Sequence, residues 1–214
     1  MNNIIVVTNA LGELGTNCYT VVNTDTRQAV IIDPAANARF LCDMIENQNY
    51  ILTGLLLTHG HVDHIGAISG ILEKYPEVKV FCAEEEVEVL RNPNINLSSM
   101  FGQSMSFEAD VKLKNNQVID LIGADMTCIH TPGHTGGGMC FYFKESKLLF
   151  SGDTLFEESV GRTDFPTGDG ATLVKSIRER LFSLPEDVVV YPGHGGKTTI
   201  GNEKRYNPYA GSGL

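Results

Sequence analysis

Three histidines and an aspartate lie within six residues of this sequence, in the stretch T-H-G-H-V-D-H at positions 58–64. His59 and His61 are two residues apart after an apolar run, so in an extended segment they project the same way. Asp63 and His64 follow where a helix is expected to begin. A single tetrahedral ion does not need all four side chains. The pattern therefore predicts two adjacent divalent ions. Imidazole and carboxylate ligands without a nearby cysteine favour zinc, with iron and manganese as alternatives.

Three later segments share a layout in which a strand end is followed by a glycine-containing turn. They are T-P-G-H-T-G-G at 131–137, S-G-D-T-L-F at 151–156 and Y-P-G-H-G-G at 191–196. Functional groups of layered α/β proteins lie on loops past strand ends, so these loops are expected to meet at one edge. The predicted ligands are His59, His61 and His134 for one ion, Asp63, His64 and His194 for the other, and Asp153 as a bridge between them.

Such a pair of ions suggests hydrolytic chemistry. Two ions about 3.5–4 Å apart share one hydroxide and lower its pKa toward neutrality. Because two dications outweigh two carboxylates and a hydroxide, the site keeps a positive charge inside an acidic protein. It is therefore expected to favour anionic or strongly polarised small molecules and to stabilise an oxyanion.

The elements that position these residues follow from the apolar pattern. The predicted strands are 4–8, 19–23, 29–32, 53–58, 78–82, 117–121, 126–130, 139–143, 148–150 and 188–191. The predicted helices are 37–47, 62–75, 83–91 and 170–182, with a short one near 201–206. Residues 92–108, rich in Asn, Ser, Gly and Met, are predicted to form a loop that is a candidate lining of the site. Strands in two batches, each followed by helix, predict two packed sheets with helices outside, in one domain over 1–214.

Composition excludes several classes of protein. A net charge of −10 over 214 residues argues against a nucleic-acid partner. The five cysteines form no C-x-x-C pair, which predicts no disulfide framework and a reducing compartment. The N-terminal segment lacks the features of a signal peptide, and no apolar stretch is long enough to span a bilayer. We therefore expect a cytoplasmic protein without a membrane partner; the oligomeric state has no sequence signal.

Other chemically capable residues have structural interpretations. His130 ends a strand and is expected to be a hydrogen-bonded structural histidine. Met100 and Met105 are expected to pack within their loop, and the glutamates at 84–86 are expected to form a solvated helix start. Arg162 has two interpretations of equal weight. It forms an ion pair with Asp164 or Asp169, or it is an anion clamp near the metals.

With these residues assembled, the sequence resembles the metallo-β-lactamase superfamily. The resemblance rests on T-H-x-H-x-D-H at 58–64 followed by His134, Asp153 and His194 in the family's order, and runs from about residue 3 to about residue 209. It implies an α/β fold of the αββα type, a sandwich of two mixed β-sheets with helices on both outer faces. It also implies a dinuclear site at one edge, with ligands at the seven positions assigned above.

Within this superfamily the chain is most similar to the glyoxalase II group, the hydroxyacylglutathione hydrolases, and to its short bacterial members. The similarity rests on T-N-C-Y at 16–19, T-P-G-H-T-G-G at 131–137, and the segments 150–169 and 191–208. It implies a thioesterase for acylated thiols such as lactoylglutathione, in which a metal-bridging hydroxide attacks the carbonyl, Asp63 steers its proton and a thiolate leaves. It further suggests that Arg162 binds an acidic thiol carrier. Arg162 and Lys197 are the candidate substrate-binding residues, and the regions around them and the loop 92–108 are expected to shape specificity.

The chain also departs from its relatives. The longer glyoxalase II enzymes add a C-terminal helical region that grips glutathione, whereas here only residues 195–214 follow His194. Gly138 stands where many members have a second histidine, at a position that is not a ligand. Class B β-lactamases typically carry a signal peptide and a cysteine in place of Asp153, so this sequence argues against antibiotic hydrolysis.

Two rival interpretations remain open. Persulfide dioxygenases share the sandwich and a G-R-T-D-F stretch, here at 161–165, and hold one iron with two histidines and the equivalent of Asp153. These dioxygenases have a motif similar to Y-P-A-H-D at the place where this chain has Y-P-G-H-G, at 191–195. This difference favours the hydrolase, and the mononuclear iron dioxygenase is the alternative. The second rival is a metal-stabilised binding module without turnover.

Overall fold

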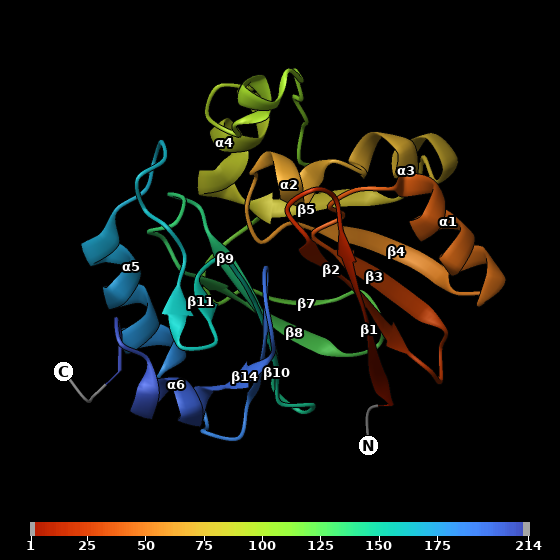
Figure 1. Ribbon diagram of the computed structural model, residues 1–214. Helices are drawn as coiled ribbons and strands as arrows, with labels where there is room; N and C mark the ends of the chain where they lie inside the picture. The colour runs from red at the N-terminus through yellow and green to blue at the C-terminus, as the bar shows by residue number, and fades with distance from the viewer. Residues whose placement is uncertain (1–2, 212–214) are drawn as a thin grey trace.

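Two six-stranded mixed β-sheets pack face to face, and helices cover both outer faces, in the computed structural model, which describes residues 3–211 (Figure 1). The helices of the first half of the chain cover the first sheet, and those near the C-terminus cover the second. This arrangement confirms the αββα sandwich expected from the sequence.

The first sheet positions the histidine stretch at 58–64, which follows the carboxyl end of one of its interior strands. Its strands, in order, are β1 (Ile4–Leu11), β2 (Thr16–Asn23), β3 (Gln28–Ile32), β4 (Ile51–Leu56), β5 (Lys79–Ala83) and β6 (Val111–Leu113). β1 to β3 are antiparallel, and β3 to β6 run parallel. Every residue of β2 is buried, as expected for a strand covered on both faces. The parallel pairing brings the carboxyl ends of β3 and β4 to the same edge.

The second sheet brings three further loops to that edge. Its strands, in order, are β14 (Thr198–Thr199), β13 (Val189–Pro192), β10 (Leu148–Gly152), β9 (Met139–Phe143), β8 (Asp125–His130) and β7 (Val118–Asp120). β10 and β13 are parallel, and the other pairs are antiparallel. A small hairpin of β11 (Leu155–Phe156) and β12 (Ser159–Val160) follows β10.

The helices are short. They are α1 (Ala38–Asn47), α2 (Val62–Ile65), α3 (Ile68–Lys74), η1 (Glu84–Glu86), α4 (Val87–Arg91), η2 (Ser98–Phe101), α5 (Gly170–Ser176), the π-helical turn η3 (Ile177–Leu181) and α6 (Ile200–Tyr206). Side chains cap the N-termini of α1, α5 and α6. At the start of α5, the side chain of Asp169 accepts from the amide of Thr172 at 2.7 Å. α1 and α3 lie on the first sheet, and α5 and α6 on the second (Figure 1).

Three apolar clusters hold the layers together. The one between the sheets contains Tyr19 and Phe81 from the first sheet and Phe141 and Phe150 from the second. Burying a side chain of this size stabilises the fold by about 1.5–3 kcal/mol. The other two clusters lie beneath the outer helices. Separating the two sheets would therefore expose the apolar surface of the central cluster, and removing the helices would expose that of the outer two.

The predicted helix over 62–75 is wrong in one respect, because it is broken into α2 and α3. A Cβ at Gly66 would lie 2.3 Å from the backbone oxygen of Ala35. The amide of Ala67 donates to the backbone oxygen of Pro34 at 2.8 Å. The backbone therefore packs directly on the loop after β3, and this contact bends the chain at a point that the apolar pattern does not mark.

Other expectations have mixed outcomes. The five cysteines are free, as predicted, and all five are buried. The glutamates at 84–86 were expected in solvent, but Glu86 is fully buried. Met105 packs on the core, whereas Met100 is 71% exposed, so its predicted packing is wrong. Within residues 3–211, no helix is both long and apolar enough to cross a bilayer.

Candidate metal centre

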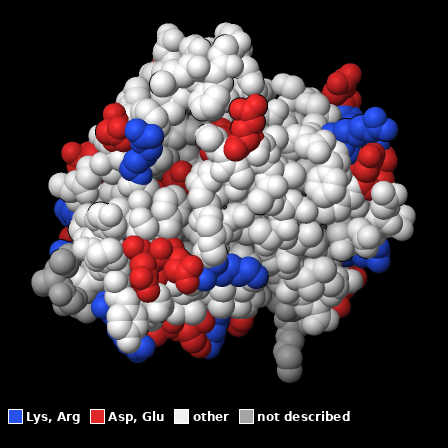
Figure 2. Space-filling model, in the orientation of Figure 1, with Lys and Arg blue, Asp and Glu red and all other residues white. Residues whose placement is uncertain are grey.

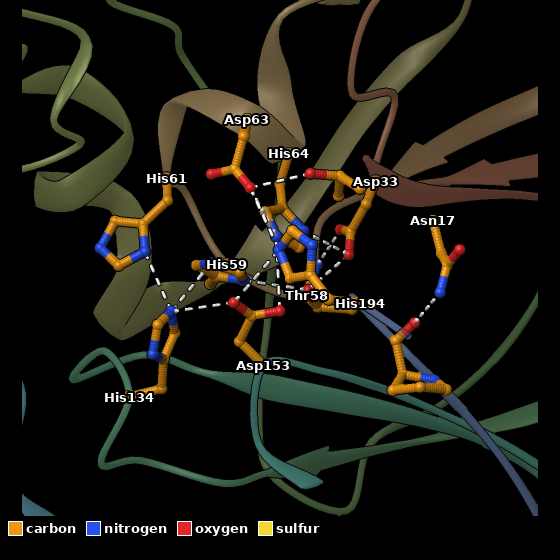
Figure 3. Close-up of polar contacts among 12 residues, drawn as sticks. Asn17, Asp33, Thr58, His59, His61, Asp63, His64, His134, Asp153 and His194 are labelled. Atoms are coloured by element: carbon orange, nitrogen blue, oxygen red, sulfur yellow. Dashed lines mark hydrogen bonds and ion pairs between the residues drawn. The ribbon is translucent and has the colours of Figure 1, made fainter. Parts of the chain in front are cut away.

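The seven predicted ligands converge at one edge of the sandwich, where loops from both sheets meet (Figure 3). The first sheet supplies His59 and His61, which follow β4, and Asp63 and His64, which lie in α2. The second sheet supplies His134 between β8 and β9, Asp153 after β10, and His194 after β13. Because each sheet contributes part of the set, the cluster forms only when the two sheets pack together.

His59, His61 and His134 form a first, buried group. Nε2 of His134 lies 3.2 Å from Nε2 of His59 and 3.0 Å from Nδ1 of His61. Ligand atoms bound to one tetrahedral zinc at about 2.0–2.1 Å lie roughly 3.4 Å from one another. The spacing of the three nitrogens therefore fits one shared ion.

Asp63, His64 and His194 form the second group. Oδ2 of Asp63 lies 3.5 Å from Nε2 of His64 and 3.3 Å from Nε2 of His194. Asp153 lies between the groups, because its Oδ1 is 3.5 Å from Nε2 of His64 and its Oδ2 is 3.6 Å from Nε2 of His134. This position suits a carboxylate that binds one ion through each oxygen.

Two facing atoms of the cluster show that the residues fit a cation. Nε2 of His64 and Oδ1 of Asp153 are buried and have no hydrogen-bond partner. Buried polar atoms are normally paired, so an orphaned pair requires an explanation. A divalent ion between them would satisfy both atoms at once.

The outer ring nitrogens of three histidines are held by fixed partners. These pairs are His59 Nδ1 with Thr58 Oγ1 (3.1 Å), His64 Nδ1 with Asp33 Oδ2 (2.9 Å) and His134 Nδ1 with the backbone oxygen of Arg162 (2.7 Å). The Thr58 hydroxyl donates to Asp33, so it accepts from His59. Each Nδ1 therefore carries a proton, which orients Nε2 toward the centre as a metal ligand requires. Sequence reasoning missed Asp33, although its position directly after β3 is the same strand-end signal that marked the ligands.

His64 is expected to release a proton when a metal binds. Burial lowers the pKa of this ring, but the carboxylates of Asp63, Asp153 and Asp33 outweigh burial and raise the pKa to about 10. Without metal, the ring therefore holds its extra proton at neutral pH, and metal binding must displace that proton. The apparent zinc affinity should rise roughly tenfold per pH unit for each proton displaced between pH 6 and 8. Calorimetry in buffers of different ionisation enthalpy measures this proton release, and a pH-independent affinity would contradict it.

A cavity of about 540 Å³ opens over the cluster. Its lining includes the predicted ligands His61, Asp63, His134, Asp153 and His194. Arg162 also lines it, but the guanidinium is paired with Asp164 (2.7 Å for both bonds), which is one of the two alternatives that the sequence left open.

The remaining candidate residues lie apart from the cavity. Lys197 does not line it, and the ammonium of this residue lies over the ring of Tyr191, 4.8 Å from the centroid. His130 has the structural role expected of it, because its Nε2 bonds the backbone oxygen of Gly136 at 3.1 Å.

Comparison with known proteins identifies the family. Residues 11–194 match the model of the metallo-β-lactamase superfamily. The chain belongs to this superfamily. Its relatives include a hydroxyacylglutathione hydrolase, GloC, of Haemophilus influenzae, which is 38% identical over 92% of this chain and 93% of that protein.

Solved structures of the superfamily match the whole sandwich. The structure of BLEG-1, described as a B3 metallo-β-lactamase, superposes with a TM-score of 0.91 at 35% identity, covering 96% of this chain and 99% of that one. The protein TTHA1623 in a di-iron-bound form superposes with a TM-score of 0.83 at 34% identity, with the same coverage of 96% and 99%. Proteins of this superfamily bind metal ions, and the clustered histidines and aspartates of this chain fit that property.

The T-N-C-Y motif attaches the His194 loop of this superfamily member to β2. The side chain of Asn17 donates to the backbone oxygens of Pro192 and Gly195, both at 3.0 Å, on either side of His194. The hydroxyl of Thr16 donates to Oδ2 of Asp63 at 2.8 Å. The motif thus positions a ligand loop and one carboxylate, a role that its spacing alone did not reveal.

Glu86 ties together the two loops that carry the first group of histidines. Its Oε1 accepts from the amide of Gly60 at 2.8 Å, and its Oε2 accepts from the amide of Gly137 and the hydroxyl of Thr135, both at 2.9 Å. Burial raises the pKa of this carboxyl to about 7, although these three bonds oppose the rise. No sequence signal separates this glutamate from its exposed neighbours.

A glycine is required where the His194 loop crosses the cluster. A Cβ at Gly193 would lie 2.1 Å from Oδ1 of Asp153 and 2.8 Å from Cε1 of His64. Any side chain there would displace two predicted ligands, which accounts for the glycine before His194 in Y-P-G-H-G-G.

Proposed function

We propose that this protein is a hydrolase that cleaves thioesters of small thiols with two divalent ions, zinc being the first candidate. The observation that carries the proposal is the pair of ligand groups with Asp153 between them at the base of a cavity. The likeness to GloC supports a thioester as the substrate. The di-iron form of TTHA1623 supports two ions and leaves iron as an alternative to zinc.

In this proposal His59, His61 and His134 would hold one ion, Asp63, His64 and His194 the other, and Asp153 would contact both. Bound divalent ions polarise a carbonyl oxygen and lower the pKa of a bound water. The contacts of Thr58, Asp33 and the backbone of Arg162 with Nδ1 of these rings direct each Nε2 toward the centre, and metal binding would displace the extra proton of His64. They also keep the rings from rotating during the reaction.

We assign to Asp63 the role of steering the proton of the attacking water. Burial opposes its ionisation, but His64, His194 and the hydroxyl of Thr16 hold the pKa of Asp63 below its usual range. The carboxylate is therefore ionised, and Thr16 fixes Oδ2 at 2.8 Å. A thiolate is a good leaving group, so the reaction needs no strong general acid.

Thiol release from lactoylglutathione by zinc-loaded protein, followed with a thiol-reactive dye beside a metal-free sample, tests the proposal. Metal-dependent turnover of about 10 per second or more, an ordinary enzyme rate, is the expected result. Failure to cleave lactoylglutathione and simple acyl thioesters alike would contradict it.

β-Lactam hydrolysis is a second candidate, because the BLEG-1 likeness favours it. The aspartate at position 153, where class B enzymes typically have cysteine, argues against it. A chromogenic cephalosporin assayed with the same zinc-loaded sample separates the two activities. The persulfide dioxygenase alternative predicts one iron per chain and oxygen uptake with a persulfide, which metal analysis and an oxygen electrode measure.

A further inference from the structure

The segment that follows α4 forms an uncharged lobe beside the cavity. We define this lobe as residues 92–107, which contain no acidic or basic residue. Its base is closed by an ion pair in which Arg91 Nε donates to Oε1 of Glu108 at 2.7 Å. Figure 2 shows that the surface over this part of the molecule is almost free of charged side chains, whereas the lower half of the same face carries both signs.

A hydrogen bond attaches the lobe to the segment that carries the predicted ligands. The amide of Val62, between two predicted ligands, donates to the backbone oxygen of Asn96 at 2.8 Å. The buried side chain of Asn96 donates to the backbone oxygen of Met105 at 2.8 Å. The next residue, Leu97, has φ of 69°, a left-handed conformation that is unfavourable for leucine, and its side chain lines the cavity. Such strain persists only where surrounding contacts impose it.

The rim of the cavity exposes large apolar side chains. Leu14 (53%), Met100 (71%) and Phe101 (47%) are all exposed, and all three line the cavity. Deeper in the cavity, the rings of Phe165 and Phe156 lie 6.0 Å from the ring of His61 and 6.2 Å from that of His194, respectively. Apolar side chains thus line the cavity both at its exposed rim and beside the predicted ligands.

Among the described residues, the lining of the cavity offers no unpaired arginine or lysine side chain. Arg162 is the one arginine or lysine among the described residues that line it. Its guanidinium makes two bonds of 2.7 Å to Asp164 and lies 3.8 Å from the ring centroid of Phe165. Glutathione carries a carboxylate at each end, and neither has an unpaired arginine or lysine to meet in this lining.

We propose that the cavity selects thioesters with an uncharged, apolar acyl chain, which lies against Leu97, Phe101 and the neighbouring apolar walls. Thiol carriers are polar molecules, so the apolar part of a natural thioester is ordinarily its acyl chain. The inference rests on the proposed function and replaces the anionic substrate expected from the sequence. Arg162 then acts as part of an aromatic wall and not as an anion clamp.

A chain-length series tests the inference. The probes are acetyl, butyryl and hexanoyl thioesters of N-acetylcysteamine, an uncharged thiol, with lactoylglutathione for comparison. We expect kcat/KM to rise about two- to fourfold per methylene group, and hexanoyl to exceed lactoylglutathione. Phe101→Ala should make kcat/KM depend much less on the length of the acyl chain. Phe40→Ala, which removes another exposed phenylalanine (40%) on α1 outside the cavity, should leave this dependence unchanged.

A second variant tests the pairing of Arg162. Asp164→Asn removes the bidentate partner and frees the guanidinium at the rim. We expect kcat/KM for lactoylglutathione to rise severalfold in this variant, while the hexanoyl thioester gains nothing. An equal change for both thioesters would show that the ion pair has no part in selection.

Binding of the uncleavable hexyl and ethyl thioethers, measured by calorimetry, separates this inference from the proposed function. If no thioester is cleaved but the hexyl compound binds several times more tightly than the ethyl one, the thioesterase proposal fails and the apolar site stands. If thioesters are cleaved but the acyl series is flat, or lactoylglutathione is preferred, the inference is overturned and the thioesterase stands. A preference that follows the length of the thiol instead of the acyl chain would also overturn it.

Discussion

Replacement of His59 with alanine is expected to lower kcat/KM for a thioester by at least about a thousandfold, which corresponds to roughly 4 kcal/mol of transition-state stabilisation. His59 contributes to two groups of ligand atoms, one with His61 and His134 and one with His64 and Asp153. Its loss should remove metal from the first group and disturb the second. Metal analysis after dialysis should show less than the wild-type zinc content, beside the fall in rate.

His130→Ala is the matched control for this substitution. His130 is the one histidine of the chain outside the cluster, and its Nε2 bonds only the backbone oxygen of Gly136 among the contacts that the structure describes. We expect wild-type zinc content and a rate within about threefold of wild type. Near-wild-type turnover by metal-depleted His59→Ala protein would contradict the metal-dependent mechanism.

Replacement of Glu86 with alanine is expected to destabilise the protein by about 2–5 kcal/mol, because the buried amides of Gly60 and Gly137 lose their acceptor. The melting temperature should fall by roughly 5–15 °C for a chain of this size. Zinc affinity should fall about 10–100-fold, since Glu86 joins the loop of His59 and His61 to that of His134 without touching any ligand ring.

Glu85→Ala separates this role from a general effect of removing charge. Glu85 is the adjacent glutamate and is exposed, so its replacement should change the melting temperature by no more than about 2 °C. Differential scanning calorimetry of both variants, with and without zinc, measures the difference. Equal melting temperatures and equal zinc affinities for the two would show that Glu86 does not hold the loops together.

The sandwich and the ligand groups could be predicted because both leave a local trace. β-Branched runs mark the strands, and the chain order of strands and helices restricts the layers to few arrangements. The predicted ligands follow strand ends, where parallel pairing brings loops together at one edge, so residue type and place in the chain were sufficient to group them. The helix break at Gly66 left no such trace, because it follows from a backbone contact with Ala35.

Sequence alone therefore determined the family, the layered fold and the seven residues that converge at its edge. Only the tertiary structure decided which residues hold them. Asp33 and Glu86 act through partners 25 to 51 residues away in the chain, and a carboxylate acquires its role from those partners and not from its neighbours in sequence. The pairing of Arg162 and the uncharged lobe at the rim likewise depend on side-chain placement in space, and this placement decides whether the cavity presents charge or apolar surface to a substrate.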